Sequence, residues 1–462
     1  MARQPSKRLQ FSAQRFLARR MEHALVRRDV AMDDDPMRAQ SRSLAAGCVL
    51  AAIGVAGCAV VALIAPRGSP GDAQIVMARE SGAVYVRLGD VLHPAFNLAS
   101  ARLVARTDAA PVVVGEASIA RVKRGPRVGI PGAPNVIGTP LSNQTWTVCD
   151  AERTVVSVGQ PLPSLDPSRT VLVTPRAESA ATTYLLYDGW RAEVDLRDRA
   201  VVRALSLEGV APLRVSRALL DTVPEAPTVT VPRIAGVGTA GPSSLGGFTV
   251  GTVVRVARAD VDDFYVVLAD GVQRIGEVAA DVIRFAYGAT GELPLITPAT
   301  IAATSSVETL PVGSFPRRSR AAVGAGDAVL VCAQWRPDST SGESNTVVLT
   351  GDPTAMDTVD VTALAQADGE GPHVDAVAIP GGRSAFVRSA RILGDDGATG
   401  PRFLVTDSGV AFGLRDDDAA TYLGLRASPG AAPWSILAHL PSGPELSTDA
   451  ASVPRDGVAP PS

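Results

Sequence analysis

The sequence predicts an α+β protein with a short N-terminal helix, one transmembrane helix and an elongated region of four small repeat modules around a central β domain. Three observations predict this fold. The 24 residues between Arg42 and Arg67 carry no charge. Four later segments share a pattern of two short strands joined by a turn and followed by a helix-like stretch. Two inserts between those segments are rich in Val, Thr, Gly and Pro, which favours strands and turns.

Charge is unevenly distributed along the chain. The 462 residues include 44 basic and 47 acidic side chains, which gives a net charge of −3. Residues 1–43 hold ten Lys and Arg against five Asp and Glu, and residues 44–65 hold none, so the remainder has a net charge of −8. Because phosphate binding needs a concentrated basic surface, this balance argues against a nucleic-acid-binding protein.

The apolar stretch Leu44–Ala65 predicts a membrane-spanning helix. Its 22 residues would form a helix about 33 Å long, enough to cross a hydrocarbon core of about 30 Å. A buried helix of a soluble domain and a cleaved signal peptide are the alternatives, but a signal peptide normally has a shorter region before its apolar core. A lipoprotein processing site at Cys58 is disfavoured because the apolar run continues to Ala65. We therefore expect an uncleaved signal anchor, with residues 1–43 cytoplasmic by the positive-inside rule and the later residues outside.

The arm before this span predicts an amphipathic helix over residues 5–28. Its apolar side chains recur at three- and four-residue spacing, as one face of a helix requires. Such a helix could lie on anionic lipid or dock on a partner, and the alternative is a plain orientation signal. The acidic run Asp33–Asp35 is interpreted as a solvated linker. The residues predicted to make cytoplasmic contacts are Arg15, Arg19, Arg20, Arg27 and Arg28.

The four patterned segments place hairpin turns near residues 90, 188, 270 and 408. Asp188-Gly189 and Asp270-Gly271 are strong hairpin signals. An internal duplication, in which the two inserts pair into one β domain, explains this order. The predicted organisation is an arm (1–43), a transmembrane helix (44–65), module 1 (66–125), the first part of the β domain (126–177), module 2 (178–232), a linker (233–247), module 3 (248–304), the second part of the β domain (305–400), module 4 (401–447) and a disordered tail (448–462).

Two cysteines support the pairing of the inserts. Cys149 lies in the first insert and Cys332 in the second, and each has a tryptophan three residues away on the opposite side. An oxidising compartment outside the membrane favours a disulfide between them, although two unpaired buried cysteines remain an alternative. The closed loop would stabilise the fold by about 5 kcal/mol on the chain-entropy model. Cys48 and Cys58 lie in the predicted span and are interpreted as small packing residues.

Sequence motifs for catalysis or for metal and cofactor binding are absent. The chain has no G-x-x-x-x-G-K-[ST] loop, no H-E-x-x-H and no G-x-S-x-G, and its four histidines are scattered. Asp260-Val-Asp262-Asp263 begins like a calcium loop, but Phe264 occupies the next ligand position. We therefore predict no catalytic, cofactor-binding or metal-binding residue. A site assembled from distant residues stays open as an alternative.

Several stretches together resemble one known family. They are Phe16-LARRMEHALVRRD, Asp35-PMRAQSRSL, Leu92-HPAFNLASARL, Val128-GIPGAP, Trp146-TVCD, Leu185-LYDGWRAEVDL and Val331-CAQW. This combination, which extends from about residue 5 to about residue 450, resembles EccB of the actinobacterial type VII (ESX) secretion system. The resemblance implies one span, a periplasmic region of four repeats and a central β domain, and a disulfide that carries over to Cys149 and Cys332.

The same resemblance implies a role. EccB is a core subunit of the inner-membrane complex, with EccC, EccD and EccE as its partners and EccC as the ATP-driven motor. We therefore expect a single-pass protein of the inner membrane that self-associates and scaffolds protein export across a mycobacterial-type cell envelope, without a cofactor. Two other functions stay open. Family members are often called ATPases, although the missing P-loop argues against ATP hydrolysis here, and the repeats could bind peptidoglycan.

Overall fold

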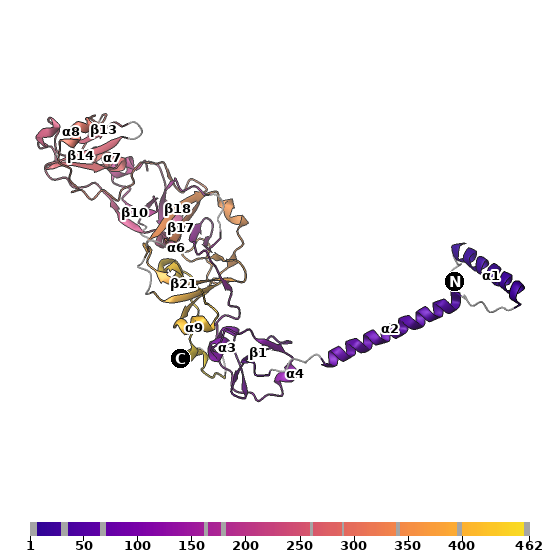
Figure 1. Ribbon diagram of the computed structural model, residues 1–462. Coiled ribbons are helices and arrows are strands. Elements are labelled where there is room, and N and C mark those ends of the chain that lie inside the picture. Colours follow the sequence, from indigo (N-terminus) through magenta and orange to yellow (C-terminus); the bar gives the residue numbers. More distant parts are fainter. Residues whose placement is uncertain are drawn as a thin grey trace. The chain divides into compact units, whose positions relative to one another are not determined.

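A computed structural model of the chain describes residues 7–28, 36–64, 71–160, 165–176, 182–258, 262–288, 291–338, 342–394 and 400–456. The chain divides into two compact units, Met1–Gly71 and Asp72–Ser462. Figure 1 labels the helices and strands of both.

The first unit consists of two helices, α1 (Lys7–Arg27) and α2 (Pro36–Ile64). Within α2, Ser41–Ala59 is long and apolar enough to cross a membrane, and no other helix among the described residues meets that test. The predicted span started at Leu44, which lies inside α2, and α2 itself begins eight residues earlier. The predicted end of the span, Ala65, and the acidic run Asp33–Asp35 lie outside the described residues.

The second unit contains five sheets in the part of the chain that the structure describes. The first sheet has the order β3-β2-β1-β4, and Ile75 and Val76 lie in separate hydrophobic cores on its two faces. Its side chains therefore alternate between two covered faces, as expected for a strand buried on both sides. Its elements are β1 (Ile75–Ala78), β2 (Val84–Leu88), β3 (Val91–Pro94), α3 (Leu98–Ala105), β4 (Val112–Val114) and α4 (Glu116–Ile119).

The second and third sheets share one hydrophobic core, which includes Val201 on α5 and Val282 on α7. The second sheet has the order β11-β8-β9-β10-β12, with β16 paired to β8, and the third has the order β13-β14-β15. The elements of the second sheet are β8 (Thr170–Pro175), β9 (Tyr184–Tyr187), β10 (Trp190–Val194), α5 (Arg199–Ala204), β11 (Leu213–Val215), α6 (Arg217–Thr222), β12 (Glu225–Val229) and β16 (Ala322–Val323). Those of the third are the 3-10 helix η1 (Ser243–Leu245), β13 (Val253–Val256), β14 (Asp263–Leu268), β15 (Gly271–Ile275), α7 (Glu277–Ala286) and α8 (Pro298–Ala302).

The central sheet combines strands that are far apart in the sequence, in the order β18-β17-β6-β7-β20-β19. Strand β6 pairs antiparallel with β17, which sets Cys149 opposite Cys332 and Trp146 opposite Trp335. The predicted disulfide between Cys149 and Cys332 is present, and it links residues 183 positions apart. The elements are β6 (Trp146–Asp150), β7 (Thr154–Val158), β17 (Leu330–Pro337), β18 (Ser344–Gly351), the 3-10 helix η2 (Pro353–Thr358), β19 (Thr362–Ala363) and β20 (Ala376–Ala378).

The last sheet has the order β23-β22-β21-β24, with β5 paired to β21. Residues on β21, β24 and α10, among them Val387 and Ile436, join the same hydrophobic core as Trp146 and Trp335 of the central sheet. The elements are β5 (Thr139–Pro140), β21 (Arg383–Ala390), β22 (Arg402–Thr406), β23 (Ala411–Leu414), α9 (Asp417–Tyr422), β24 (Gly430–Pro433), α10 (Trp434–Leu437) and α11 (Thr448–Ala451).

Four hairpins are each followed by a helix: β2–β3 by α3, β9–β10 by α5, β14–β15 by α7 and β22–β23 by α9. The turn of the second hairpin has Asp188 at φ 45° and Gly189 at φ 83°, the left-handed pair that a two-residue hairpin needs. A Cβ atom on Gly189 would lie 2.0 Å from the carbonyl oxygen of Thr346, so only glycine fits where this turn meets β18.

The structure differs from the predicted boundaries in three places. Strand β8, predicted in the β domain within 126–177, pairs with β9, and β21, predicted there within 305–400, pairs with β22. Both differences arise because each of these strands forms an antiparallel pair with the strand that follows it in the sequence. In the predicted linker 233–247, Leu245 is 2% exposed because it packs in the core of the third sheet.

The predicted disordered tail, 448–462, is wrong for its first residues. Helix α11 is capped by the Ser447 side chain, which accepts a hydrogen bond from the Ala450 backbone N–H. Leu446 and Ala451 are fully buried in a core with Leu103 of α3. This apolar contact with a segment more than 300 positions away orders the chain. Residues 457–462 lie outside the described residues.

We predict that replacing both cysteines by alanine (C149A/C332A) lowers the free energy of unfolding by about 2–5 kcal/mol, because the unfolded chain regains the entropy of a 183-residue loop. Urea unfolding followed by circular dichroism measures the loss. The control is C48A/C58A, which removes the two free cysteines of α2. Equal midpoints for C149A/C332A and the parent chain would contradict the prediction.

Candidate functional site

Helix α6 is the element through which the second, central and last sheets meet. Its buried side chains Ala218, Leu219 and Leu220 belong to the core of Trp146 and Trp335. The helix packs on β6 and β17 of the central sheet and on α10 of the last sheet. Ser216 caps its first turn, because the Ser216 Oγ accepts a hydrogen bond from the Leu219 backbone N–H at 3.1 Å. Helix α6, which follows β11 of the second sheet, therefore packs on both the central and the last sheet.

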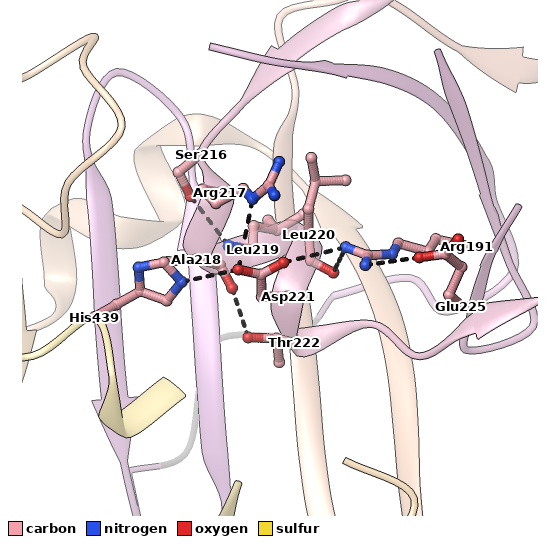
Figure 2. Close-up of polar contacts among 10 residues, drawn as sticks. All are labelled: Arg191, Ser216, Arg217, Ala218, Leu219, Leu220, Asp221, Thr222, Glu225 and His439. Atoms are coloured by element: carbon pink, nitrogen blue, oxygen red, sulfur yellow. Dashed lines mark hydrogen bonds and ion pairs between the residues drawn. The ribbon is translucent and has the colours of Figure 1, made fainter. Parts of the chain in front are cut away.

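Asp221 is the centre of the polar cluster on α6 that Figure 2 shows. Its Oδ2 lies 3.1 Å from His439 Nε2 and 3.7 Å from Arg217 Nε, and its Oδ1 lies 3.4 Å from Arg191 Nη1. His439 lies two residues after the end of α10 (Trp434–Leu437), and Arg191 lies on β10. Arg191 also donates to the Leu220 carbonyl oxygen at 2.6 Å and to Glu225 Oε2 at 3.1 Å. One carboxylate thus ties the second sheet to the last sheet.

The surroundings of Asp221 set its ionisation. Burial alone would raise the pKa of this carboxyl, but the hydrogen bond and charge of His439, with the charges of Arg217 and Arg191, outweigh burial and lower the pKa below its ordinary value. Asp221 is half-buried, with a side-chain exposure of 29%. The charged form is therefore favoured, and it contributes stability at neutral pH that is lost on acidification.

A second, fully buried polar cluster lies where α6 begins. Asp150, at the end of β6 and next to the disulfide, accepts a hydrogen bond from the Ser216 backbone N–H through Oδ2. Its Oδ1 is buried and has no hydrogen-bond partner among the described residues. Burial, the largest influence, raises the pKa of Asp150, although the charge of Arg176 and the hydrogen bonds of Ser216 and Thr154 oppose that rise.

Arg176 connects this buried carboxyl to the surrounding backbone. It is 7% exposed, and its guanidinium donates to the Ala151 carbonyl oxygen at 2.8 Å and to the Arg214 carbonyl oxygen at 3.3 Å. Asp375, the residue before β20, also belongs to this cluster. Its Oδ2 accepts a hydrogen bond from the Thr154 backbone N–H at 2.7 Å. Strands β6, β7 and β8 are thereby joined by side chains as well as by their sheets.

The predicted cytoplasmic-contact residues lie on or directly after α1, and all five are exposed: Arg15, Arg19, Arg20, Arg27 and Arg28. Arg15 stacks on Phe11, with 5.5 Å between its Cζ and the ring centroid. Phe11, Met21 and Leu25 have exposures of 63%, 67% and 83%. The structure thus places the arginines and an exposed apolar stripe on or directly after one helix.

Metal ligands do not gather in the described part of the chain, where no group of three His, Cys, Asp or Glu side chains is suited to hold an ion. Two carboxylates of the calcium-like stretch take arginine partners instead. Asp262 pairs with Arg255 at 2.7 Å, and Asp263 pairs with Arg258 and Arg274. Asp260 lies outside the described residues.

The polar clusters of α6 were not predicted from the sequence. Asp150 is the one residue of these clusters with a local indication of its role, since it follows the strand-like run Trp146-TVC. The structure shows every residue of Trp146–Asp150 buried, and a buried carboxylate requires a polar partner. Asp221 and His439 are 218 positions apart and carry no local motif. The charges and hydrogen bonds of these clusters have a structural role, because they fix the positions of neighbouring backbone segments.

Comparison with known proteins identifies the family. A family model described as "Type VII secretion system ESX-1, transport TM domain B" matches residues 3–460. The chain belongs to the EccB family. Among curated EccB proteins, "ESX-3 secretion system ATPase EccB3" of Mycolicibacterium smegmatis is 35% identical over 477 residues, covering 98% of this chain and 91% of that protein. "ESX-2 secretion system ATPase EccB2" of Mycobacterium tuberculosis is 35% identical over 485 residues, covering 98% and 96%.

Chains in solved ESX structures have the same fold. A chain in the structure of an intact ESX-5 inner membrane complex matches with a TM-score of 0.70 and 30% identity, over 100% of this chain and 98% of that chain. An EccB3 dimer from the ESX-3 core complex matches with a TM-score of 0.70 and 32% identity, over 82% of this chain and 100% of that chain.

We predict opposite pH dependences of stability for two matched substitutions, one at Asp150 of β6, which contacts the start of α6, and one at Asp221 near the end of α6. The native pKa of Asp221 is lowered, so the stability advantage of the parent chain over Asp221→Asn is present at neutral pH and shrinks as pH falls below about 4. The native pKa of Asp150 is raised, so the parent chain loses stability relative to Asp150→Asn as pH rises from about 4, by at most about 1.4 kcal/mol per pH unit.

Urea unfolding of the three proteins between pH 3 and pH 8 measures both differences. Asp72→Asn, at an exposed carboxyl near the start of the second unit, serves as the control and should show neither trend. Parallel pH profiles for Asp221→Asn and Asp150→Asn would contradict the electrostatic roles given to Asp221 and Asp150.

Proposed function

We propose that this chain is a structural core subunit of the inner-membrane complex of a type VII secretion system. The observation that carries the proposal is the match, over 100% of this chain, to a chain of an intact ESX-5 inner membrane complex. The family match over residues 3–460 supports the same role. The polar and apolar contacts around α6 suit a subunit whose sheets must keep fixed relative positions within an assembly.

In this role, α2 anchors the chain in the inner membrane as a single span. Its segment Ser41–Ala59 has the length and composition that a span needs. The arm before it is basic, which supports a cytoplasmic N-terminus and a periplasmic second unit by the positive-inside rule.

The periplasmic unit would be an array of four repeat modules around a central β domain. The recurrence of a hairpin followed by a helix in the first, second, third and last sheets supports four repeats. The central sheet, which takes strands from both halves of the chain, would be the β domain between them. Adding β8 to module 2 and β21 to module 4 gives each repeat at least three strands. Repeats stacked in this way offer a long surface for assembly.

Association with other subunits would occur on both sides of the membrane. The solved EccB3 dimer of the ESX-3 core complex supports self-association of this chain. On the cytoplasmic side, α1 presents Phe11, Met21 and Leu25 to solvent, with the exposed Arg15 stacked on Phe11. An uncovered amphipathic helix of this kind suits docking on a partner, for which EccC, EccD and EccE are the candidates.

ATP hydrolysis is the second candidate function, favoured by the word ATPase in the names of the curated relatives. The absence of a P-loop from the sequence favours the scaffold over this alternative. The full chain, purified in mild detergent, is therefore expected to release phosphate from ATP no faster than a heat-denatured sample. Turnover that is abolished by denaturation would establish the ATPase function instead.

A tagged pull-down from membranes solubilised in mild detergent tests the proposed role. We expect the chain to migrate on a native gel in one large band that mass spectrometry resolves into EccB, EccC, EccD and EccE. Replacing Arg15, Arg19, Arg20, Arg27 and Arg28 by glutamine should weaken this band, because α1 and the residue after it lose most of their positive charge. The matched control replaces five exposed arginines of the second unit, Arg153, Arg169, Arg233, Arg317 and Arg318. A lone monomer or dimer in several detergents would overturn the proposal.

A further inference from the structure

The segment Arg121–Arg127, next to the first sheet, concentrates positive charge. It reads RVKRGPR and contains four basic residues and no acidic one. The side chains of Arg121, Lys123, Arg124 and Arg127 are exposed, and none of them forms an ion pair with a carboxylate within the described ranges. Residues 72–128 contain eight basic and five acidic residues, whereas residues 129–462 contain 25 basic and 37 acidic residues. Among the residues after the membrane helix, net positive charge is therefore concentrated in the domain that follows the helix directly.

The structure fixes this segment and orients two of its side chains. The Leu92 backbone N–H of β3 donates to the Lys123 carbonyl oxygen at 2.9 Å. Arg124 stacks on Tyr85 with its Cζ 5.8 Å from the ring centroid, and Arg127 stacks on Phe96 at 5.1 Å. A guanidinium that stacks on a ring keeps its N–H edges free for an anion. Tyrosine and arginine together are also typical of the polar layer of a membrane.

The register of the sheet places the segment at the end where the chain enters the domain. The pairings of β1 with β2 and of β2 with β3 set Leu92 level with Gln74. Arg124 forms a parallel bridge to Leu92. Arg124 therefore lies at the level of the first residues of the second unit, which begins at Asp72.

The covalent chain keeps this end close to the membrane if α2 spans it. Six residues, 65–70, separate Ile64 at the end of α2 from Gly71. Seven Cα–Cα steps reach at most about 25 Å, and the polar layer itself extends several ångströms beyond the hydrocarbon core. Phosphate groups of lipids are therefore within reach of the basic segment, and they have the charge that complements it.

We propose that Arg121, Lys123, Arg124 and Arg127 bind the phosphates of anionic lipids at the membrane surface and hold the first sheet against the bilayer. The inference rests on the proposed function in one respect, that α2 anchors the chain in a membrane. Two exposed acidic residues at the same end of the sheet, Asp72 and Asp90, offset part of the positive charge but leave an excess. The acidic residues 129–462 are repelled by the same lipids, which favours this one docked orientation.

Energy transfer in lipid nanodiscs tests the proposal with the full chain. In the background C48A/C58A, a donor dye is attached to the exposed position Ala120→Cys, and an acceptor dye is carried by lipid headgroups. Discs contain phosphatidylcholine alone or with one quarter phosphatidylglycerol. We expect higher transfer with phosphatidylglycerol and a loss of that difference in high salt, because surface charges are screened.

The variant R121Q/K123Q/R124Q/R127Q should reduce transfer in the anionic discs to the phosphatidylcholine value, since each basic residue contributes about fivefold to the docking equilibrium. The matched control R153Q/R169Q/R317Q/R318Q removes the same charge elsewhere and should transfer like the parent. Equal transfer in both lipids, or an equal loss in both variants, would overturn the proposal. Retention of the chain by the discs separately reports the anchor, so a chain that is not retained would overturn the proposed function as well.

Discussion

The pairing of β6 with β17 is the constraint on which the second unit depends. It brings together two segments 183 positions apart, sets Cys149 opposite Cys332, and buries Trp146 against Trp335. Loop closure over this length costs entropy, which the disulfide removes from the folding reaction. The central sheet then serves as the surface on which α6 and the second and last sheets pack. Without that pairing, neither half of the chain could complete the sheet between them.

The positions of two carboxyl groups, those of Asp150 and Asp221, follow from this arrangement of strands and helices. Asp150 is buried because it ends β6 directly after the disulfide, and its contact with the Ser216 backbone fixes where α6 begins. Asp221 lies near the other end of α6. His439 forms a hydrogen bond with it because α10 packs on α6. The two carboxyls contact one helix but have opposite pKa shifts, because burial dominates at Asp150, whereas His439, Arg217 and Arg191 outweigh burial at Asp221. At neutral pH, the Asp221 cluster therefore stabilises the contact between α6 and the last sheet.

The sequence predicted features that depend on local pattern or on a unique pair of residues. The apolar run around Leu44 predicted α2, Asp188-Gly189 predicted the turn of β9 and β10, and two isolated thiols predicted the disulfide. Features that depend on distant contacts were missed. The ordering of α11 requires Leu103, and the site around Asp221 requires His439 from the other half of the chain. A single sequence gives no signal for such pairs, because neither partner has a motif.

The claim that β6 and β17 form the centre of the fold is tested most directly by hydrogen exchange of the full chain in detergent, read by mass spectrometry. The account predicts that backbone amides of β6 and β17 exchange most slowly of all, and that C149A/C332A speeds their exchange while leaving the amides of the first sheet nearly unchanged. Slower exchange in the first or third sheet than in β6 and β17 would contradict it, since the central pairing would then not be the last structure to open.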